Sequence, residues 1–358
     1  MTARRSRIAV IFGGRSSEHS ISCISASGVM SALDPQAYEV LAIGITPDGQ
    51  WVDLGSQVDF RIDDGALPVV EQRGAAVAFS PDPAQLLASL GQIDAAFPVL
   101  HGPWGEDGTV QGLLELAGVP YVGSGVLASA AGMDKITMKA LLGHAGLPIG
   151  AFVGITDRQW RTDAAACLAR AGALGLPAFV KPARAGSSRG ISKVQDAQQL
   201  ASAIEEARTH DPRVIVEAAV QAGREIECGV LAHADGTIRA SRCAEIVVKG
   251  AHEFYDFDAK YLEDSADLIV PADLDPALES QVQGLALRAF DALGCEGLAR
   301  VDFFVGPDGS IVVNEVNTMP GFTPISMFPR MWQASGLTYG QILDALVADA
   351  IRRGTGLR

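Results

Sequence analysis

The sequence predicts a protein of the α/β and α+β classes with more than one domain. Residues 1–124 alternate short apolar runs with helical segments, which is typical of a parallel sheet with helices on both faces. Residues 125–217 resemble a compact α+β unit around a Gly/Ser-rich loop, and residues 218–358 contain mostly antiparallel strands and a few helices. We therefore expect three domains with these boundaries, in keeping with roughly 100–200 residues per domain.

Composition narrows the class of protein. Hydrophobic residues make up 48% of the 358-residue chain and charged residues 20%, so it can bury a large core. The net charge is −14 and no run of Lys or Arg offers a basic stripe, so we expect neither nucleic acid nor a membrane as partner. A few converging cations could still bind an anionic small molecule.

Two further features favour a cytoplasmic location. The apolar stretch at residues 8–12 is too short for a signal peptide. The five cysteines are scattered and lack CxxC spacing, which indicates reduced thiols packed as small apolar residues.

The first domain is expected to contain three strands that end at glycines or turns. Apolar runs place them at residues 7–12, 38–46 and 93–102, with a helix at about 18–33. Gly13-Gly14 and His101-Gly102 lie at carboxyl ends of strands, which is where ligands bind in parallel sheets.

The rest of the chain is read in the same way. Residues 126–145 are helical up to a break at 146–148; a helix at 163–173, strands at 176–182 and near 191–194, a helix at 196–208 and a strand at 213–220 follow. The last part should contain strands at 224–233 and 237–248, a polar loop at 249–268, helices at 276–292 and 338–352, and a hairpin at 299–317 between these helices.

The hairpin ARVDFFVGPDGSIVVNEVN (299–317) carries polar residues in otherwise apolar strands. A four-residue turn at 307–310 would pair Gly306 with Ile311, Phe304 with Val313, Asp302 with Glu315, and Arg300 with Asn317. Because side chains alternate with period 2, the four polar residues would share one face.

Asp302 and Glu315 would then lie opposite each other, with Cβ atoms about 4.5–5.5 Å apart, and their charges would repel. Arg300 supplies one positive charge, and a divalent cation held by Asp302, Glu315 and Asn317 would supply the rest. Oxygen ligands favour Mg²⁺ or Mn²⁺. The alternative is a solvated strand face with a cross-strand ion pair, which the apolar neighbours disfavour.

Mg²⁺ held by one or two carboxylates usually also binds substrate phosphates. In FVKPARAGSSRGISKV (179–194), a strand delivers Lys181, and the small residues Gly186, Ser187 and Ser188 let backbone N–H groups approach phosphate oxygens. Taken alone, a simple hairpin linker explains this loop equally well. Lys135, in GMDKITMK, is a second possible phosphate cation, although by itself it reads as a surface helix lysine.

Together these residues resemble the D-alanine–D-alanine ligases of the ATP-grasp superfamily. The resemblance covers nearly the whole chain, in order: FGGRSSEHSIS (12–22), LHGPWGEDGTVQG (100–112), MDK (133–135), KPARAGSSRG (181–190), EFYDFDAKY (253–261), RVDFF (300–304) and NEVNTMPGFTPIS (314–326). It implies a three-domain ATP-grasp fold whose N-terminal domain carries the parallel sheet.

The resemblance implies that ATP lies between the second and third domains. Two Mg²⁺ (or Mn²⁺) ions would be held by Asp302, Glu315 and Asn317. The nucleotide would be bound by Lys135, Lys181, Gly186, Ser187, Ser188, Glu217, Glu225, Lys260, Asn314 and Glu315. Glu217 and Glu225 match the hinge and ribose acids of the family, although one more residue than usual separates them here.

The implied reaction has two steps and makes D-alanyl-D-alanine for peptidoglycan precursors. The carboxylate of one D-alanine takes the γ-phosphoryl group of ATP, and the amine of a second D-alanine then displaces phosphate. Arg300 and the backbone N–H of Gly321 would stabilise the oxyanion, and Glu18 would bind the first ammonium. Without the resemblance, Glu18 reads as an acid favoured at a helix N-terminus.

The remaining site residues also come from the resemblance. His101 would lie close to the substrate, although a hydrogen-bonded structural histidine is nearly as good a reading. Ser326 and Lys260 match groups that bind the second carboxylate. Tyr261, linked to Ser187 and Glu18, matches the members that form an amide, whereas ester-forming relatives carry a histidine in this role. Loop 249–268 would act as a lid.

Three alternatives remain at this point. A ligase for D-lactate or another second substrate would differ mainly at Tyr261, Ser326 and Lys260. A dinucleotide-binding oxidoreductase is disfavoured because GGRSSEHS lacks GxGxxG. A non-catalytic nucleotide-binding scaffold would have no reason to keep the costly cluster in the hairpin.

Family members are commonly homodimers built through the N-terminal domain, and we expect the same here.

Overall fold

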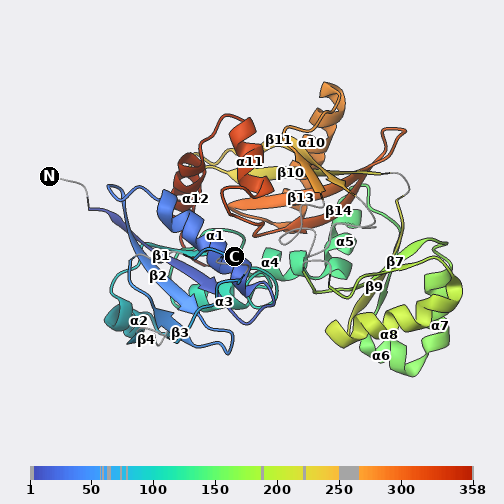
Figure 1. The fold of residues 1–358 in the computed structure, drawn as a ribbon, viewed down its shortest axis with the longest axis horizontal. Coiled ribbons are helices and arrows are strands. Elements are labelled where there is room, and N and C mark those ends of the chain that lie inside the picture. Colours follow the sequence, from blue (N-terminus) through green and yellow to red (C-terminus); the bar gives the residue numbers. More distant parts are fainter. Residues whose placement is uncertain are drawn as a thin grey trace.

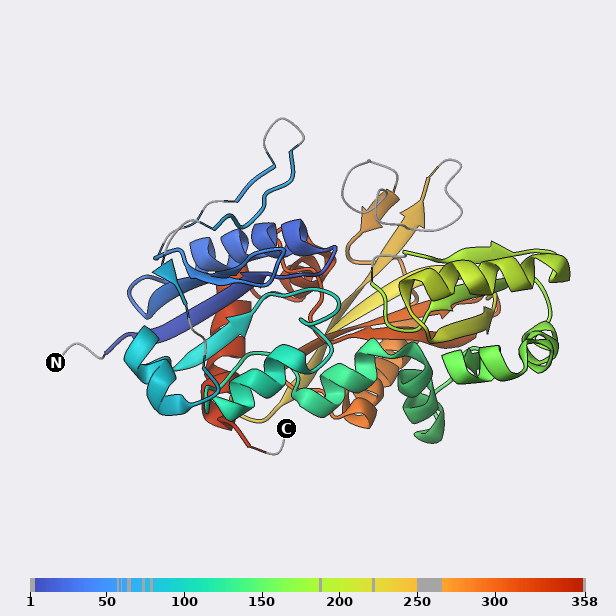
Figure 2. The same cartoon turned by 90° about the horizontal axis from the view of Figure 1, so that it is seen from below.

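The computed structural model describes residues 4–356, except 57, 59, 63–65, 73–74, 78–79, 187–188, 221–222 and 250–265. The described residues form three sheets that follow one another along the chain (Figure 1). In Figure 2 the N-terminal sheet and the middle sheet lie on opposite sides of the C-terminal sheet. This arrangement brings segments from all three sheets toward the centre of the molecule.

The N-terminal sheet has the strand order β4-β3-β2-β1-β5. Its three central strands are parallel, as the sequence predicts: β1 (Ser6–Gly13), β2 (Tyr38–Ile45) and β5 (Ala95–Pro98). Two short strands, β3 (Trp51–Asp53) and β4 (Ala75–Ala76), extend it with antiparallel pairing, so the sheet is mixed. The candidate site residues Glu18 and His101 follow the carboxyl ends of the parallel strands β1 and β5.

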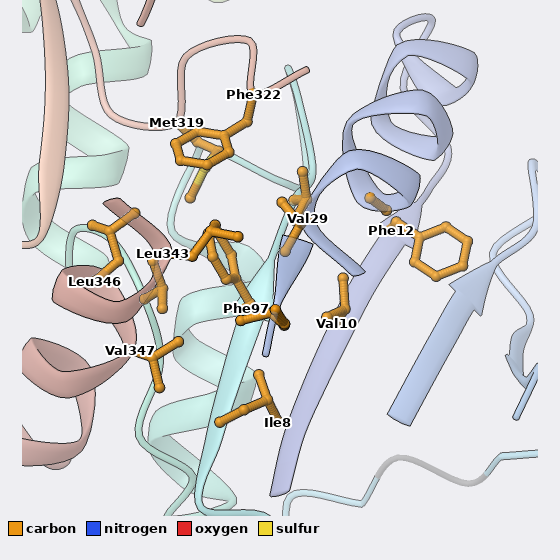
Figure 3. Packing of buried hydrophobic residues seen from close by; sticks show 14 of the residues in the cluster. Ile8, Val10, Phe12, Val29, Phe97, Met319, Phe322, Leu343, Leu346 and Val347 are labelled. Carbon is orange, nitrogen blue, oxygen red and sulfur yellow. The ribbon is translucent and has the colours of Figure 1, made fainter. Parts of the chain in front are cut away.

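Both faces of this sheet are covered by helices, as expected. One face packs against α1 (His19–Ala32) and α12 (Tyr339–Arg353), which come from opposite ends of the chain. Figure 3 shows Val10 and Phe97 of the sheet meeting Val29 of α1 and Leu343 of α12. The other face packs against α2 (Pro83–Leu90) and α3 (Thr109–Leu116). The C-terminal end of the chain is therefore built into the N-terminal core.

The middle sheet is antiparallel, with the order β6-β9-β7-β8. Its strands are β6 (Phe152–Ile155), β9 (Val214–Ala218), β7 (Ala178–Pro182) and β8 (Ser192–Val194). The helices α7 (Ala164–Gly172) and α8 (Leu200–His210) pack on it. Strand β6 and helix α6 (Asp157–Thr162) were not predicted; a capping box between Thr156 and Gln159 starts that helix.

Two short helices precede this sheet where the sequence predicts a single helical segment. Asp134 ends α4 (Val126–Met133) in an extended conformation and caps α5 (Lys135–His144) by accepting a hydrogen bond from the N–H of Thr137. The break turns α5 relative to α4 (Figure 2), and it places Lys135 at the first position of α5.

The C-terminal sheet has the order β12-β11-β10-β13-β14. Its strands are β10 (Arg224–Ala232), β11 (Ile238–Val248), β12 (Ala266–Ile269), β13 (Leu298–Val305) and β14 (Ile311–Asn317). Helix α10 (Pro276–Leu293) covers one face, and α11 (Met327–Ala334), which was not predicted, packs on the other. Among the helices that the structure describes, none is both long and apolar enough to cross a membrane.

Candidate active site

A cavity of about 1030 Å³ opens between the three sheets. It brings together all the predicted site residues that the structure describes: Glu18, His101, Lys135, Lys181, Gly186, Glu217, Glu225, Arg300, Asp302, Asn314, Glu315, Asn317, Gly321 and Ser326. Ser187, Ser188, Lys260 and Tyr261 lie outside the described residues. Among the described residues, six lysines and arginines line the cavity together with seven Asp and Glu residues. Lys135, Lys181 and Arg300 are the predicted ones among these cations, and they can bind the anionic groups of a ligand.

The hairpin pairs its polar residues as predicted, but not its apolar ones. Asp302 faces Glu315 and Arg300 faces Asn317. Closer to the turn, the predicted pairs are wrong: Phe304 faces Val312 rather than Val313, and Val305, not Gly306, faces Ile311.

Two deviations cancel in this hairpin. The N–H of Gly306 donates to the carbonyl of Ser310 (2.8 Å), so the turn closes one residue earlier than expected. An extra residue, Asn314, then forms a β-bulge that restores the register at Glu315. As a result, both Asn314 and Glu315 line the cavity.

Arg300 is held by two carboxylates. Its Nε and Nη2 donate to the two oxygens of Asp302, each at 2.7 Å, and its Nε lies 3.2 Å from Oε1 of Glu227 on β10. Burial disfavours the guanidinium charge, but Asp302 and Glu227 raise the pKa of Arg300 well above its usual value. The sequence did not indicate Glu227, because its contact with Arg300 joins strands about 70 residues apart.

The donor set of the hairpin suits Mg²⁺. Asp302, Glu315 and Asn317 all line the cavity, and each carries a side-chain oxygen. Asp302 also accepts a hydrogen bond from Nδ2 of Asn317 (3.0 Å), and Glu315 lies 3.6 Å from the ammonium of Lys135. The described residues contain no group of three or more His, Cys, Asp or Glu placed to hold a metal. Two carboxylates and an amide nevertheless fit Mg²⁺, which usually completes its shell with phosphates and water.

Lys135 ties the candidate phosphate loop to α5. Its Nζ donates to the carbonyl of Ala185 (3.0 Å), and its backbone N–H donates to the carbonyl of Ala183 (3.0 Å). On the other side of the loop, Gly186 lies so close to Glu18 that an added Cβ would be 2.3 Å from Oε1 of that carboxylate. The loop therefore meets the residue expected to hold the first ammonium.

Glu18 is the N-cap residue of α1, but its side chain makes no capping hydrogen bond. Instead, the buried residue lines the cavity beside the loop at Gly102. The helix-terminus reading and the substrate-binding reading thus both describe its position, and the side chain is available to the cavity.

Lys181 reaches the cavity from β7 and pairs with Glu217 on the neighbouring strand β9. Its Nζ lies 2.7 Å from Oε2 of Glu217, while Oε1 lies 2.7 Å from Nζ of Lys139 on α5. Burial alone would raise the pKa of Glu217, but the two ammonium groups lower it to about 2. Lys139 lies one helical turn after Lys135 in GMDKITMK, but the sequence did not indicate a role for it.

His101 links the N-terminal sheet to the loop after β14. Its Nδ1 lies 3.2 Å from the carbonyl oxygen of Met319 and its Nε2 lies 3.3 Å from Oγ of Ser25. Burial lowers the pKa of His101, which favours the neutral ring. His101 is therefore near hydrogen-bonding groups of the protein, as a structural histidine would be, and it also lines the cavity, as a substrate-binding histidine would.

Glu106 is a half-buried acid in the cavity wall that was not among the predicted site residues. Its carboxylate accepts the backbone N–H of Gly102 (2.6 Å) and that of Met319 (3.3 Å). Burial, with the nearby charge of Glu18, raises the pKa of Glu106 to about 8. Glu106 lies in the loop HGPWGEDG, five residues after His101, so its position after a strand end could have indicated a site residue.

Ser326 stands at the N-cap of α11 in the cavity wall. Its Oγ accepts the N–H of Thr323 (3.0 Å) and lies 2.7 Å from Oγ1 of Thr323. A Cβ added to Gly321 would be 3.3 Å from this Oγ, so the two residues are neighbours. The N-terminal end of a helix favours an anion, which gives Ser326 a physical reason to lie near a carboxylate.

Comparison with known proteins covers nearly the whole chain. Family models described as "D-ala D-ala ligase N-terminus" and "D-ala D-ala ligase C-terminus" match residues 7–124 and 141–348. The D-alanine--D-alanine ligase of Mycolicibacterium vanbaalenii is 56% identical and covers 100% of both chains. That of Paenarthrobacter aurescens is 52% identical over 99% of this chain and 97% of its own.

Solved structures agree in architecture. The VanG D-Ala:D-Ser ligase from Enterococcus faecalis has a TM-score of 0.82 and 37% identity, and covers 97% of this chain and 100% of its own. The D-alanine-D-alanine ligase from Coxiella burnetii has a TM-score of 0.78 and 33% identity, with 98% and 95% covered. The expected ATP-grasp fold class is confirmed. Since relatives more than half identical match it end to end, the chain belongs to the D-alanine–D-alanine ligase family.

Proposed function

We infer that this chain joins two D-alanines to D-alanyl-D-alanine with ATP, releasing ADP and phosphate, for peptidoglycan synthesis. The observation that carries the inference is the convergence of three cations, a carboxylate pair and Glu18 in one cavity of a ligase-family chain. Cations suit the triphosphate, and a buried acid suits the ammonium of an amino acid. The combination fits an enzyme that brings ATP and amino acids together.

In the first step, the residues position the γ-phosphoryl group against the carboxylate of the first D-alanine. Lys135 and Lys181 offset phosphate charge. The family resemblance assigns phosphate binding to Gly186, Ser187 and Ser188 as well. One or two Mg²⁺ (or Mn²⁺) ions held by Asp302, Glu315 and Asn317 would neutralise charge during phosphoryl transfer. Glu217, Glu225, Lys260 and Asn314 complete the nucleotide site.

In the second step, the residues serve the carbonyl of the acyl phosphate. Arg300 and the N–H of Gly321 stabilise the oxyanion that forms when the second amine attacks. Glu18 holds the first ammonium, and the family resemblance assigns Ser187 and Tyr261, which lie outside the described residues, to the same catalytic group. His101 lines the substrate pocket, and Ser326 and Lys260 bind the carboxylate of the second D-alanine.

The proposal also includes the domain boundaries, the cellular location and the oligomeric state of the protein. The three sheets take their strands from residues 6–98, 152–218 and 224–317, which supports domains at 1–124, 125–217 and 218–358. The five cysteines are buried and free, which fits a reducing cytoplasm. A homodimer built through the N-terminal domain remains part of the proposal and rests on the family.

The test of the reaction is phosphate release from ATP by the purified chain. We expect release only with both D-alanine and Mg²⁺, and D-alanyl-D-alanine in equal amount. Asp302→Asn should lower kcat by about 10²–10³, as expected when charge stabilisation is lost. Asp308→Asn is the matched control, because Asp308 is an exposed carboxylate in the turn of the same hairpin. Release without D-alanine, or equal activity of both variants, would contradict the proposal.

The second substrate is tested separately. Tyr261 predicts a preference for D-alanine over D-lactate at neutral pH. The kcat/KM values for D-alanine, D-lactate and D-serine as the second substrate should be highest for D-alanine. A clear preference for D-lactate would overturn the assignment of Tyr261, and a preference for D-serine would place the chain with the Enterococcus relative.

A further inference from the structure

Lys139 is a buried lysine beside the nucleotide site. It is 2% exposed, and lysines are almost never buried unless paired. It lies one helical turn after Lys135 on α5, so the two side chains extend from the same face of the helix. Lys135 reaches the phosphate loop, whereas Lys139 reaches Glu217 (2.7 Å).

Glu217 is shared by two ammonium groups. Lys139 holds Oε1 and Lys181 holds Oε2, each at 2.7 Å. The two lysines differ in access: the Lys139 side chain is 3% exposed and that of Lys181 is 14% exposed. Both lysines line the cavity, but Lys181 offers the more accessible ammonium to a ligand there, whereas Lys139 is almost fully enclosed beside the carboxylate.

This arrangement poses a problem for phosphate binding. If Lys181 turns toward a phosphate, the buried Glu217 loses one of its two positive partners. A buried charge without a partner is strongly unfavourable. The cost of leaving the Glu217 carboxylate with fewer positive partners would make nucleotide binding less favourable by the same free energy. A second, permanent partner removes the problem.

We propose that Lys139 is a positioning residue for nucleotide binding: it keeps the buried Glu217 carboxylate paired, so that Lys181 is free to bind phosphate. The proposal rests on the proposed function, because it needs ATP in this cavity. With both lysines in place the pKa of Glu217 is lowered to about 2, so the carboxylate is charged before the nucleotide binds.

The experiment is a double-mutant cycle on the full chain, read as the Kd of a non-hydrolysable ATP analogue with Mg²⁺ by calorimetry. Lys139→Met should raise the Kd about 10- to 100-fold, which lies within the range of coupling energies between residues in one ion-pair network. Lys139→Arg should restore binding to within about threefold, because it keeps the charge. The control Arg161→Met removes an exposed cation of α6 and should leave the Kd unchanged.

The Glu217→Gln background makes the test specific. With no buried charge to keep paired, adding Lys139→Met should change the Kd little, and this double variant also avoids a stranded carboxylate that could prevent folding. A rise of tenfold or more in that background would show that Lys139 binds the nucleotide itself, and it would overturn the proposal. An unchanged Kd in the single variant, with only a lower melting temperature, would overturn it as well.

Binding of the analogue by the wild-type chain distinguishes a failure of the proposed function from a failure of the role proposed for Lys139. If the wild-type chain does not bind the analogue, the proposed function fails. If it binds the analogue and Lys139→Met binds it equally well, only the role of Lys139 fails.

Discussion

Replacing Arg300 with methionine removes the guanidinium that neutralises the centre of the C-terminal sheet. Three contacts are lost: two hydrogen bonds of 2.7 Å to Asp302 and the 3.2 Å contact with Glu227. The side chains of all three residues are at most 15% exposed, so water does not replace the lost partner well.

The magnitude follows from these contacts. Hydrogen bonds to charged groups contribute about 1.5–3 kcal/mol each, so the two bonds to Asp302 suggest about 3–6 kcal/mol. Removing one partner of a buried ion pair costs about 3–5 kcal/mol in general. We therefore expect Arg300→Met to lower the free energy of unfolding by about 3–5 kcal/mol at pH 8, and kcat by about 10²–10³ if Arg300 stabilises the oxyanion.

Urea denaturation followed by circular dichroism, without nucleotide or Mg²⁺, measures the stability. The destabilisation should shrink at acid pH, because protonated carboxyl groups no longer need a positive partner. Arg161→Met is the control; its pair with Asp157 is on the surface, so we expect a change within about 0.5 kcal/mol. A loss below about 1 kcal/mol at pH 8 would refute the reasoning that these charges depend on Arg300.

Two more predictions concern the cavity wall. Because the folded-state pKa of Glu106 is raised to about 8, the folded protein holds a proton that the unfolded chain releases near pH 4.5, so this group lowers stability as pH rises from about 4.5 to about 8. Glu106→Gln should therefore gain in melting temperature relative to the wild type between pH 5 and pH 8.5; a constant difference would contradict this. Gly186→Ala should raise the KM for D-alanine about tenfold or more, since its Cβ would be 2.3 Å from Oε1 of Glu18. Gly172→Ala, where the Cβ meets open space in α7, is the control, and an unchanged KM in Gly186→Ala would show that Glu18 yields without consequence.

The hairpin shows how local rules predicted part of the site. Period-2 alternation and a four-residue turn at 307–310 predicted Asp302 opposite Glu315, and the structure has this pair. The same rules could not predict the bulge at Asn314, because a bulge depends on what both strands pack against. The correct pairing at the acids thus arose from a turn one residue shorter and a strand one residue longer than expected.

The sequence by itself determined the alternation of strands and helices, the acid pair in the hairpin and the motifs that identify the family, because these depend on residues close together in the chain. Only the tertiary structure decided which polar groups meet: Lys139 with Glu217, Arg300 with Glu227, and Glu106 with the backbone of Met319. These partners lie about 70 to 210 residues apart. Their pairing follows from how the sheets pack around the cavity, where low solvent access makes each buried charge require a partner.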